Sequence, residues 1–455
     1  MGADRSRLPG LGVDPPFRFP AIGHRTLGNG LQLRTVEHSS VPVITFVLQI
    51  DGGSGADPAG LEGMAAITAD MVDEGTGALS AIEVSEALAG IGGEYDVDVG
   101  PDATVFTLTT LTRFAERGAA LLADIITRPS MRGHDFDRVR QLRLDRLKQL
   151  KDLPPAVAER ALLKLLYAGH PYGHLSIGSD GSLRRLRLED AAAFHASRFV
   201  PRRATLVAAG ALSHDALARV IEDAFGGWTD TPAVETTAAA DIEPGPRAGS
   251  RLAVVPRDGA AQSELRIGLL AARRTTPDYP ALVVMNAVLG GQFVSRIMLK
   301  LREEKGFTYG ARTGFDWRRG RAPFSLQSSI QTASTAEAIL DSLVELEAIR
   351  GSRPPAAEEM ALAKASLTLG YPRNFETAQQ VARSVAQLAL YGLPDSYFEE
   401  FTPRINAVTP EVVTAAAERY LDPSRLVTLV VGDHGAIGGS LAGLGLGEPE
   451  VLPAE

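Results

Sequence analysis

The amino-acid sequence predicts an α+β protein with two tandem homologous halves, each an antiparallel sheet covered by helices, joined by a linker into a clam-like arrangement. Three observations predict this class. Short apolar strand signals alternate with long helical patterns, an aperiodic segment lies near the middle, and the second half repeats landmarks of the first. With 455 residues, the chain is also too long for one ordinary domain.

In the first half, strand and helix signals follow one another in a clear order. A turn at residues 27–31 separates two strand-like pieces, and residues 41–50 form an apolar, β-branched run that predicts a buried strand. A hairpin is predicted from residues 95–99 and 104–110, and a short buried strand at 205–210. The predicted helices span residues 61–73, 80–89, 113–126, 134–152 and a segment that ends near Tyr167.

An internal repeat relates the two halves. The ten residues that begin at Pro201 are similar to the ten that begin at Pro423, and a glutamate precedes each segment by the same distance, so the offset is 222 residues. The strand-like run of the first half also has a counterpart at residues 265–270. A duplicated α+β unit explains these matches better than chance similarity of short strands does.

The segment 228–249 is rich in Ala, Thr, Pro and Gly and has no periodicity, which is typical of a linker. It divides the chain into two comparable parts. The predicted organisation is an N-terminal arm (1–24), a first half (25–228), a linker (229–249) and a second half (250–455).

The composition excludes several classes of function. The chain has no cysteine, which excludes disulfides, thiolate nucleophiles and cysteine metal sites, and its net charge of -9 argues against nucleic-acid or anionic-membrane partners. No apolar run is long enough to span a membrane, and the polar, proline-rich residues 1–20 lack a signal-peptide pattern. The chain as given is expected in the cytoplasm, or in the periplasm if a leader has been removed.

Residues 301–310 join an amphipathic helix to an aromatic-rich strand, predicted at 307–315, through a glycine suited to end a helix. Arg302 and Tyr309 then flank one corner. A guanidinium and a phenol are both donors, so together they can hydrogen-bond a peptide carbonyl or the oxyanion that forms from it. The alternative is a surface arginine and a half-buried strand tyrosine. Gly290 and Gly291, before this helix, fit either a close backbone approach or a plain turn.

The order of elements, the duplication and this corner resemble the pitrilysin-type (inverzincin) metallopeptidases, in particular the short bacterial members related to mitochondrial processing peptidase. The resemblance extends from about residue 25 to residue 433. It rests on residues 63–76, which are similar to the family's zinc helix, on residues 92–96, 170–173 and 177–178, and on Arg302 and Tyr309 with Gln331 and Thr332 beyond them.

The sequence departs from this family at the metal site. The family motif is H-x-x-E-H on one helix plus a glutamate about 76 residues later, because two imidazoles one turn apart hold zinc and the carboxylate between them acts as base. The corresponding residues here are Ala66, Ala69, Asp70 and Arg146. The resemblance therefore implies that this chain holds no zinc and hydrolyses no peptide by itself.

Of the eight histidines, only His170 and His174 have a spacing used by metal ligands. Pro171 and Gly173 prevent a helix there, so a pair of turn histidines is expected rather than a ligand pair. A Ser-His-Asp enzyme is set aside, because no G-x-S-x-G elbow is visible.

The family contains paired subunits in which one chain carries zinc and the other carries the arginine and tyrosine, and this sequence resembles the second kind. The resemblance implies a non-catalytic, substrate-holding subunit of a heterodimeric zinc peptidase, with Arg302 and Tyr309 placed at the zinc site of an H-x-x-E-H partner and a peptide as substrate. Two alternatives stay open. One is a non-enzymatic peptide-binding or structural module, and the other is a subunit of a peptidase that trims a biosynthetic precursor peptide.

A further expectation concerns what replaced the metal. In the family fold the second histidine and the distal glutamate meet at one ion, so Asp70 and Arg146 are predicted to form a partly buried salt bridge. A slip of one residue would instead bring Asp145 beside Asp70. The alternative is that Arg146 lies on a solvated helix face with its neighbouring basic residues.

Overall fold

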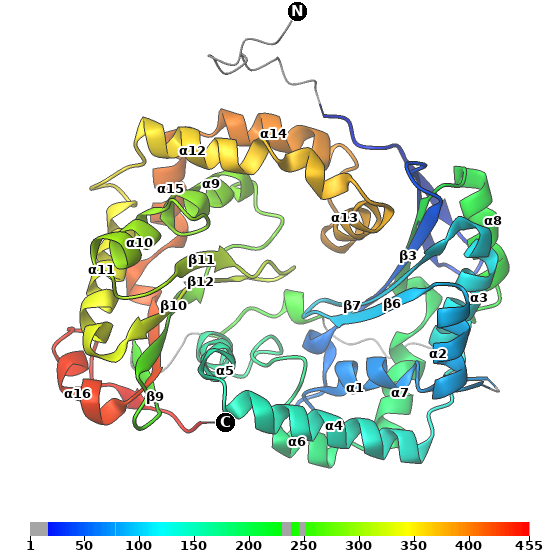
Figure 1. Cartoon of the computed structure of the whole chain (residues 1–455), viewed down its shortest axis with the longest axis horizontal. Coiled ribbons are helices and arrows are strands. Elements are labelled where there is room, and N and C mark those ends of the chain that lie inside the picture. The colour runs from blue at the N-terminus through cyan, green and yellow to red at the C-terminus, as the bar shows by residue number, and fades with distance from the viewer. Residues whose placement is uncertain (1–16, 78, 230–237, 246–250, 455) are drawn as a thin grey trace, which may run out of the picture.

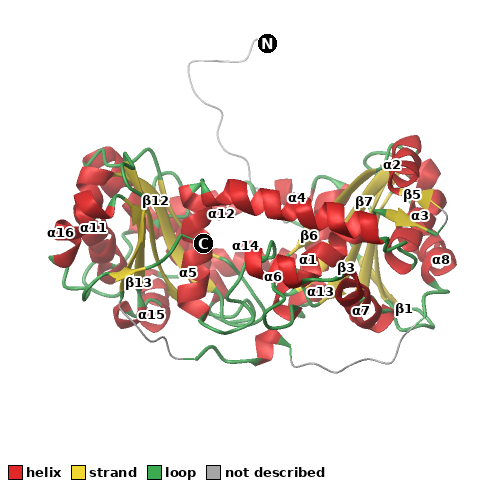
Figure 2. Ribbon diagram, turned by 90° about the horizontal axis from the view of Figure 1, so that it is seen from below, coloured by secondary structure: helices red, strands yellow, loops and turns green. Residues whose placement is uncertain are grey.

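The computed structural model describes residues 17–77, 79–229, 238–245 and 251–454. Two six-stranded sheets stand at opposite sides of the molecule, and helices cover both faces of each sheet (Figure 1). Viewed from below, the same sheets lie at the two ends with helices between them (Figure 2). The predicted fold class, two α+β halves in a clam-like arrangement, is confirmed.

The sheet of the first half has the order β1-β2-β8-β3-β7-β6. Its centre, β3 (Val43–Asp51), is almost wholly buried, as its apolar run predicts. The predicted turn joins β1 (Ile22–Thr26) to β2 (Gln32–Glu37), and the predicted hairpin consists of β6 (Glu94–Val99) and β7 (Ala103–Leu111). The short strand at the end of this half is β8 (Ala204–Gly210).

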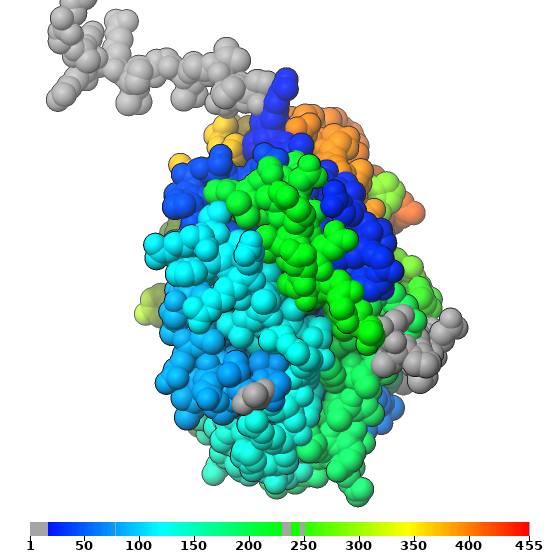
Figure 3. All heavy atoms as spheres, turned by 90° about the vertical axis from the view of Figure 1, so that its right-hand side faces the viewer, coloured from blue at the N-terminus to red at the C-terminus, as the bar shows by residue number. Residues whose placement is uncertain are grey.

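The first five helices of this half agree with the predicted ranges except at their ends, whereas α6, α7 and α8 were not predicted. Ser80 caps its helix through a reciprocal pair of hydrogen bonds with Glu83, as a capping box requires. Figure 3 shows the outer face of this half, where segments coloured cyan to green form much of the surface. The helices are α1 (Met64–Met71), α2 (Ala81–Gly90), α3 (Ala115–Thr127), α4 (Gly133–Lys151), α5 (Pro154–Tyr167), α6 (Asp180–Arg185), α7 (Leu188–Arg198) and α8 (His214–Phe225), with a two-stranded ribbon of β4 (Gly75–Thr76) and β5 (Leu79–Ser80).

The second sheet repeats the first. Its order is β11-β12-β10-β13-β9-β14, so β9, β13, β10, β12 and β11 occupy the places of β2, β8, β3, β7 and β6. The predicted counterparts are thereby matched: β10 pairs with β13 just as β3 pairs with β8. The strands are β9 (Leu252–Pro256), β10 (Gln262–Leu270), β11 (Ala311–Phe315), β12 (Pro323–Gln331), β13 (Val427–Gly432) and β14 (Glu450–Val451).

The helices of the second half are α9 (Tyr279–Leu289), α10 (Arg296–Met298), α11 (Thr335–Ala348), α12 (Ala357–Thr368), α13 (Ala378–Tyr391), α14 (Tyr397–Ala407), α15 (Pro410–Tyr420) and α16 (His434–Ala442). One turn of a wider helix, Leu299–Glu304, continues α10 with π-type geometry.

The prediction of purely antiparallel sheets was wrong in one respect. Strand β8 runs parallel to β2, and β13 runs parallel to β9, which also pairs in parallel with β14. A long helical connection precedes each of β8 and β13, and each then pairs with a strand that comes earlier in the sequence. A connection of that length allows parallel entry, which a short hairpin does not.

The two halves exchange helices. Helix α5 belongs to the first half in sequence but packs its apolar residues, such as Val157 and Leu163, against β10 and β13 of the second sheet. Conversely, α13 packs Val381 and Val385 against β3 and β8 of the first sheet. Both helices lie between the sheets in Figure 1. The halves are therefore locked together by buried apolar surface, which a flexible linker alone would not provide.

The turn between β11 and β12 adds a polar lock between the halves. The backbone N–H of Arg319 donates to Asp102 at 2.9 Å, and its guanidinium forms an ion pair with Asp51. The buried Arg318 donates to the carbonyl of Tyr172 at 3.1 Å. Residues 230–237 and 246–250 of the predicted linker, and residues 1–16 of the predicted arm, lie outside the described residues.

Candidate degenerate metal site and exposed arginine–tyrosine corner

Helix α1 carries Ala66, Ala69 and Asp70, the residues that the resemblance places at the family's zinc ligands and base. Ala66 and Ala69 are buried and offer no donor atom, and the carboxylate of Asp70 is already engaged by an arginine. Within the described residues, no cluster of three or more His, Asp or Glu side chains is arranged to hold a metal ion. These residues do not fit zinc, because a tetrahedral site needs at least three protein ligands.

The partner of Asp70 is Arg143, and the predicted bridge to Arg146 was wrong. The Nε of Arg143 lies 2.7 Å from Oδ2 of Asp70. Arg146, almost one turn further along α4, is exposed and donates to Oε1 of Gln149 at 3.3 Å. Asp145 accepts from Gln141 at 3.1 Å, so the repulsive alternative is absent as well. The face of α4 that meets α1 was misplaced by three residues.

The Asp70–Arg143 pair is expected to be a modest stabiliser. The Arg143 side chain is only 15% exposed, but that of Asp70 is 41% exposed, so solvent screens the pair. In a double-mutant cycle, Asp70→Ala and Arg143→Ala should show a coupling of about 1 kcal/mol in the free energy of unfolding. The cycle of Asp70→Ala with Arg146→Ala is the matched control and should be additive. Coupling to Arg146 as large as to Arg143 would contradict the observed pairing.

A cavity of about 540 Å³ opens where α1, α4 and β6 meet. Acidic, basic and apolar side chains all contribute to it. Its lining residues are Asp70, Asp73, Glu74, Tyr95, Asp96, Val97, Val139, Leu142, Arg143, Arg146 and Ile177.

Asp73 has the most perturbed carboxyl group of this cavity. Burial, together with the nearby charges of Glu74 and Asp70, raises the pKa of Asp73 to about 7, against the opposing effects of a backbone hydrogen bond and of Arg138. No sequence pattern predicted this raised pKa, because Asp73 is not at a ligand position of the family motif. Its only sequence signal is its place directly after the degenerate helix.

The raised pKa of Asp73 predicts a pH-dependent stability. Between pH 4 and pH 7 the folded chain binds a proton at Asp73 that the unfolded chain has lost, so the free energy of unfolding should fall as the pH rises through this window. Asp73→Asn should remove this decline and should raise stability at pH 8 by roughly 2 kcal/mol, with little effect at pH 4. Urea denaturation at several pH values measures this. If the stability of the wild type instead rises from pH 4 to pH 7, and that of Asp73→Asn rises by the same amount, Asp73 does not have the raised pKa.

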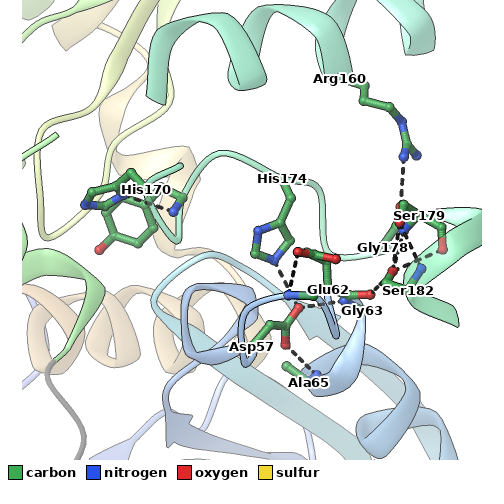
Figure 4. Close-up of polar contacts among 12 residues, drawn as sticks. Asp57, Glu62, Gly63, Ala65, Arg160, His170, His174, Gly178, Ser179 and Ser182 are labelled. Carbon is green, nitrogen blue, oxygen red and sulfur yellow. Dashed lines mark hydrogen bonds and ion pairs between the residues drawn. The ribbon is translucent and has the colours of Figure 1, made fainter. Parts of the chain in front are cut away.

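The two closely spaced histidines lie in a segment of turns and bends, as predicted. His174 Nε2 lies 3.0 Å from Oδ2 of the buried Asp57, which also accepts from the N–H groups of Gly63 and Ala65 at 2.7 Å each (Figure 4). Asp57 thus caps the first turn of α1, although it precedes the helix by several residues. The ring of His170 contacts the carbonyl of Ile242 at 3.0 Å, and burial lowers its pKa.

Arg302 lies on the π-type turn after α10, and its side chain is 35% exposed. Its guanidinium stands 4.6 Å from the centre of the Phe293 ring and 3.3 Å from a carboxylate oxygen of Glu303. The helix ends at Gly306, whose φ of +66° is the left-handed conformation that the sequence predicted there. The stacking on Phe293 holds the guanidinium at the surface.

Tyr309 lies in a loop rather than in the predicted strand. Strand β11 begins only at Ala311, so Phe307 to Gly310 are irregular backbone and the predicted range 307–315 was too long. The reason is local: Thr308 turns the chain by bonding the backbone of Gly310 through its hydroxyl. As a result, Tyr309 is 93% exposed instead of half-buried.

Exposed apolar side chains accompany this corner. Phe293 is 62%, Val294 48% and Leu299 46% exposed, and they precede Arg302 by nine, eight and three residues. Gly290 lies at the base of this segment, where a Cβ atom would come within 2.8 Å of the backbone N of Thr313 in β11. The close backbone approach considered for this glycine is therefore present, and it fixes the segment against the sheet.

Two family models match the sequence. "Insulinase (Peptidase family M16)" matches residues 34–179, and "Peptidase M16 inactive domain" matches residues 185–367. The substituted positions Ala66, Ala69 and Asp70 lie in the first match. Arg302 and Tyr309 lie in the second.

Individual proteins are also similar to this chain. An uncharacterized zinc protease of Mycobacterium tuberculosis is 25% identical over 415 residues, which is 90% of this chain and 93% of that protein. A probable mitochondrial-processing peptidase subunit beta of Schizosaccharomyces pombe is 25% identical over 273 residues, 60% of this chain and 59% of the relative.

Solved structures share the fold. The peptidase M16 inactive domain from Pseudomonas fluorescens superimposes with a TM-score of 0.84 at 24% identity, covering 90% of this chain and 98% of that one. A protease from Helicobacter pylori superimposes with a TM-score of 0.82 at 18% identity, covering 91% and 100%. With matches in both halves, the chain belongs to the peptidase M16 family.

Proposed function

We propose that this chain is the non-catalytic, substrate-holding subunit of a heterodimeric zinc peptidase and supplies Arg302 and Tyr309 to the zinc site of an H-x-x-E-H partner. The observation that carries the proposal is the contrast within one chain. Among the described residues the helix at the expected metal position offers no ligand set, whereas Tyr309 is 93% exposed. The Arg302 side chain is partly exposed at the same corner, with its Nε 3.3 Å from a carboxylate oxygen of Glu303.

The two donors would act on the substrate carbonyl. As the peptide bond is attacked, negative charge develops on the carbonyl oxygen, and a guanidinium and a phenolic hydroxyl can both donate hydrogen bonds to it without changing their protonation state. Arg302 is already oriented by its stacking on Phe293, so little side-chain freedom would be lost on binding. The zinc, the attacking water and the general base would all come from the partner.

The surroundings of the corner support a partner-facing role. Phe293, Val294 and Leu299 expose apolar surface next to Arg302, and such surface is typically covered when a complex forms. Strand β6 of the first half is the outermost strand of its sheet, so one of its edges remains open for an extended peptide. A relative named as a processing-peptidase subunit fits a chain that works as one member of a pair.

The test is reconstitution. The purified chain alone should contain no stoichiometric zinc and should cleave no unfolded peptide, whereas titration into a zinc-bearing H-x-x-E-H homologue from the same source should raise peptide hydrolysis until a 1:1 ratio is reached. Metal analysis and cleavage of a quenched fluorescent peptide measure both. One zinc per chain that is lost on substituting His170 and His174, or an activity unchanged by mixing, would contradict the proposal.

A further inference from the structure

The cavity beside the degenerate metal helix contains four carboxyl groups, three of which have an arginine partner. Asp70 pairs with Arg143 at 2.7 Å, Asp96 pairs with Arg383 of α13 at 2.7 Å, and Glu74 forms an ion pair with Arg138. Asp73 has no lysine or arginine within ion-pair distance in the described part of the chain. Arg146 also lines the cavity, but it is exposed and bonds Gln149.

A second polar group in the cavity is also unsatisfied. The hydroxyl of Tyr95, on β6, is shielded from solvent and has no hydrogen-bond partner among the described residues. The charges of Asp73, Asp70 and Asp96 together with burial raise the pKa of Tyr95, so its hydroxyl stays protonated and lies close to these carboxyl groups. A buried hydroxyl without a partner costs free energy, which a ligand can recover by bonding it.

The walls of the cavity restrict the kind of ligand. Val139, Leu142 and Ile177 are apolar, and Leu142 is 57% exposed. One unpaired carboxyl group and one phenol are too few oxygen ligands for a divalent metal ion. They suit a monovalent cation whose aliphatic stem can lie along the apolar wall.

We propose that this cavity binds a monovalent organic cation, an alkyl guanidinium or alkyl ammonium group, with Asp73 as its counter-ion and the Tyr95 hydroxyl as a hydrogen-bond partner. The cation completes the charge pairing of the cavity in the place where relatives would hold a metal. The group can belong to a basic side chain of a peptide or to a free small amine. Only the peptide source rests on the proposed substrate-holding function.

The test uses matched probes on the purified chain alone, without any partner subunit. Butylguanidinium and its neutral isostere butylurea differ in charge but hardly in shape, and calorimetry measures their binding. At pH 8 butylguanidinium should bind at least about tenfold more tightly than butylurea, the usual value of one charge-assisted hydrogen bond. A five-residue acetylated peptide with one central arginine, and the same peptide with citrulline, form the second pair.

Asp73→Asn should abolish the preference for the charged probe, and Tyr95→Phe should weaken it. The matched control is Asp98→Asn, which removes the same charge from an exposed residue of β6 that does not line the cavity and should leave binding unchanged. Asp73→Asn is expected to be at least as stable as the wild type, so loss of binding in a folded variant reports on the site. Circular dichroism verifies the fold of each variant.

The pH dependence gives an independent readout. Asp73 must be ionised to act as counter-ion, so lowering the pH from 8 to 6 should weaken butylguanidinium binding by about tenfold in the wild type and not in Asp73→Asn. The other titratable and charged groups that line the cavity are Asp70, Glu74, Tyr95, Asp96, Arg143 and Arg146. Arg138 acts on Asp73 without lining the cavity, and all of these groups are unchanged in this comparison.

Two sources of the ligand are then distinguished by affinity. Tighter binding of the arginine peptide than of butylguanidinium supports a peptide side chain, and the reverse supports a small free amine. Equal binding of charged and neutral probes, the absence of saturable binding by either charged probe, or full binding by Asp73→Asn overturns the proposal. None of these outcomes depends on reconstituted peptidase activity, so this proposal and the proposed function fail separately.

Discussion

Arg302→Ala is expected to lower the kcat of the reconstituted heterodimer by about 100-fold, the usual effect of removing one donor from a developing oxyanion. Stacking on Phe293 orients the guanidinium, and the Arg302 side chain is 35% exposed, so part of it is accessible to a substrate. Tyr309→Phe removes one hydroxyl and should lower kcat by about tenfold, because a neutral donor stabilises the oxyanion less than a charged one does. Steady-state kinetics at saturating partner and substrate measure both effects.

The control for this prediction is Arg312→Ala. Arg312 is an exposed arginine of β11, three residues after Tyr309, whose guanidinium donates to Gln327 at 3.2 Å. Its removal changes the net charge by the same amount and should leave kcat unchanged. If Arg302→Ala alters only the concentration of partner needed for full activity, then Arg302 docks the partner and its role as an oxyanion donor is wrong.

Asp57→Ala is expected to lower the free energy of unfolding by about 3 kcal/mol, because several hydrogen bonds of a buried carboxylate are lost together. The Asp57 side chain is completely buried and accepts from the N–H groups of Gly63 and Ala65, with His174 Nε2 at 3.0 Å. Without it, two backbone donors at the start of α1 and one ring nitrogen remain buried and unsatisfied. The shift in the midpoint of urea unfolding measures this loss of stability, provided that the dependence of the unfolding free energy on urea concentration is unchanged.

Asp57→Asn is the graded control for that experiment. The amide oxygen still accepts one hydrogen bond, so the destabilisation should be about half as large. Asp180→Ala offers a surface comparison, since Asp180 is exposed and pairs with Arg184 one turn away on α6. Its unfolding curve should overlay that of the wild type. A loss at Asp57 no greater than at Asp180 would show that the cap contributes little.

The sequence by itself determined the features that depend on neighbouring residues. The apolar run of β3 and the left-handed Gly306 are each set by a few consecutive residues, and each lies where it was predicted. The repeat with its shared offset predicted two equivalent sheets, since similar segments fold alike. The absence of ligand side chains at Ala66 and Ala69 likewise needed only the residue types.

The tertiary structure alone decided what depends on distant segments. Residue spacing does not fix how two helices are rotated against each other, so Arg143 and not Arg146 meets Asp70. Helices α5 and α13 are exchanged because each covers an apolar face of the other half's sheet. Which sheet faces need cover is decided only when both sheets have formed. The pKa of Asp73 depends in the same way on burial and on charges from α1 and α4, which the chain brings together only on folding.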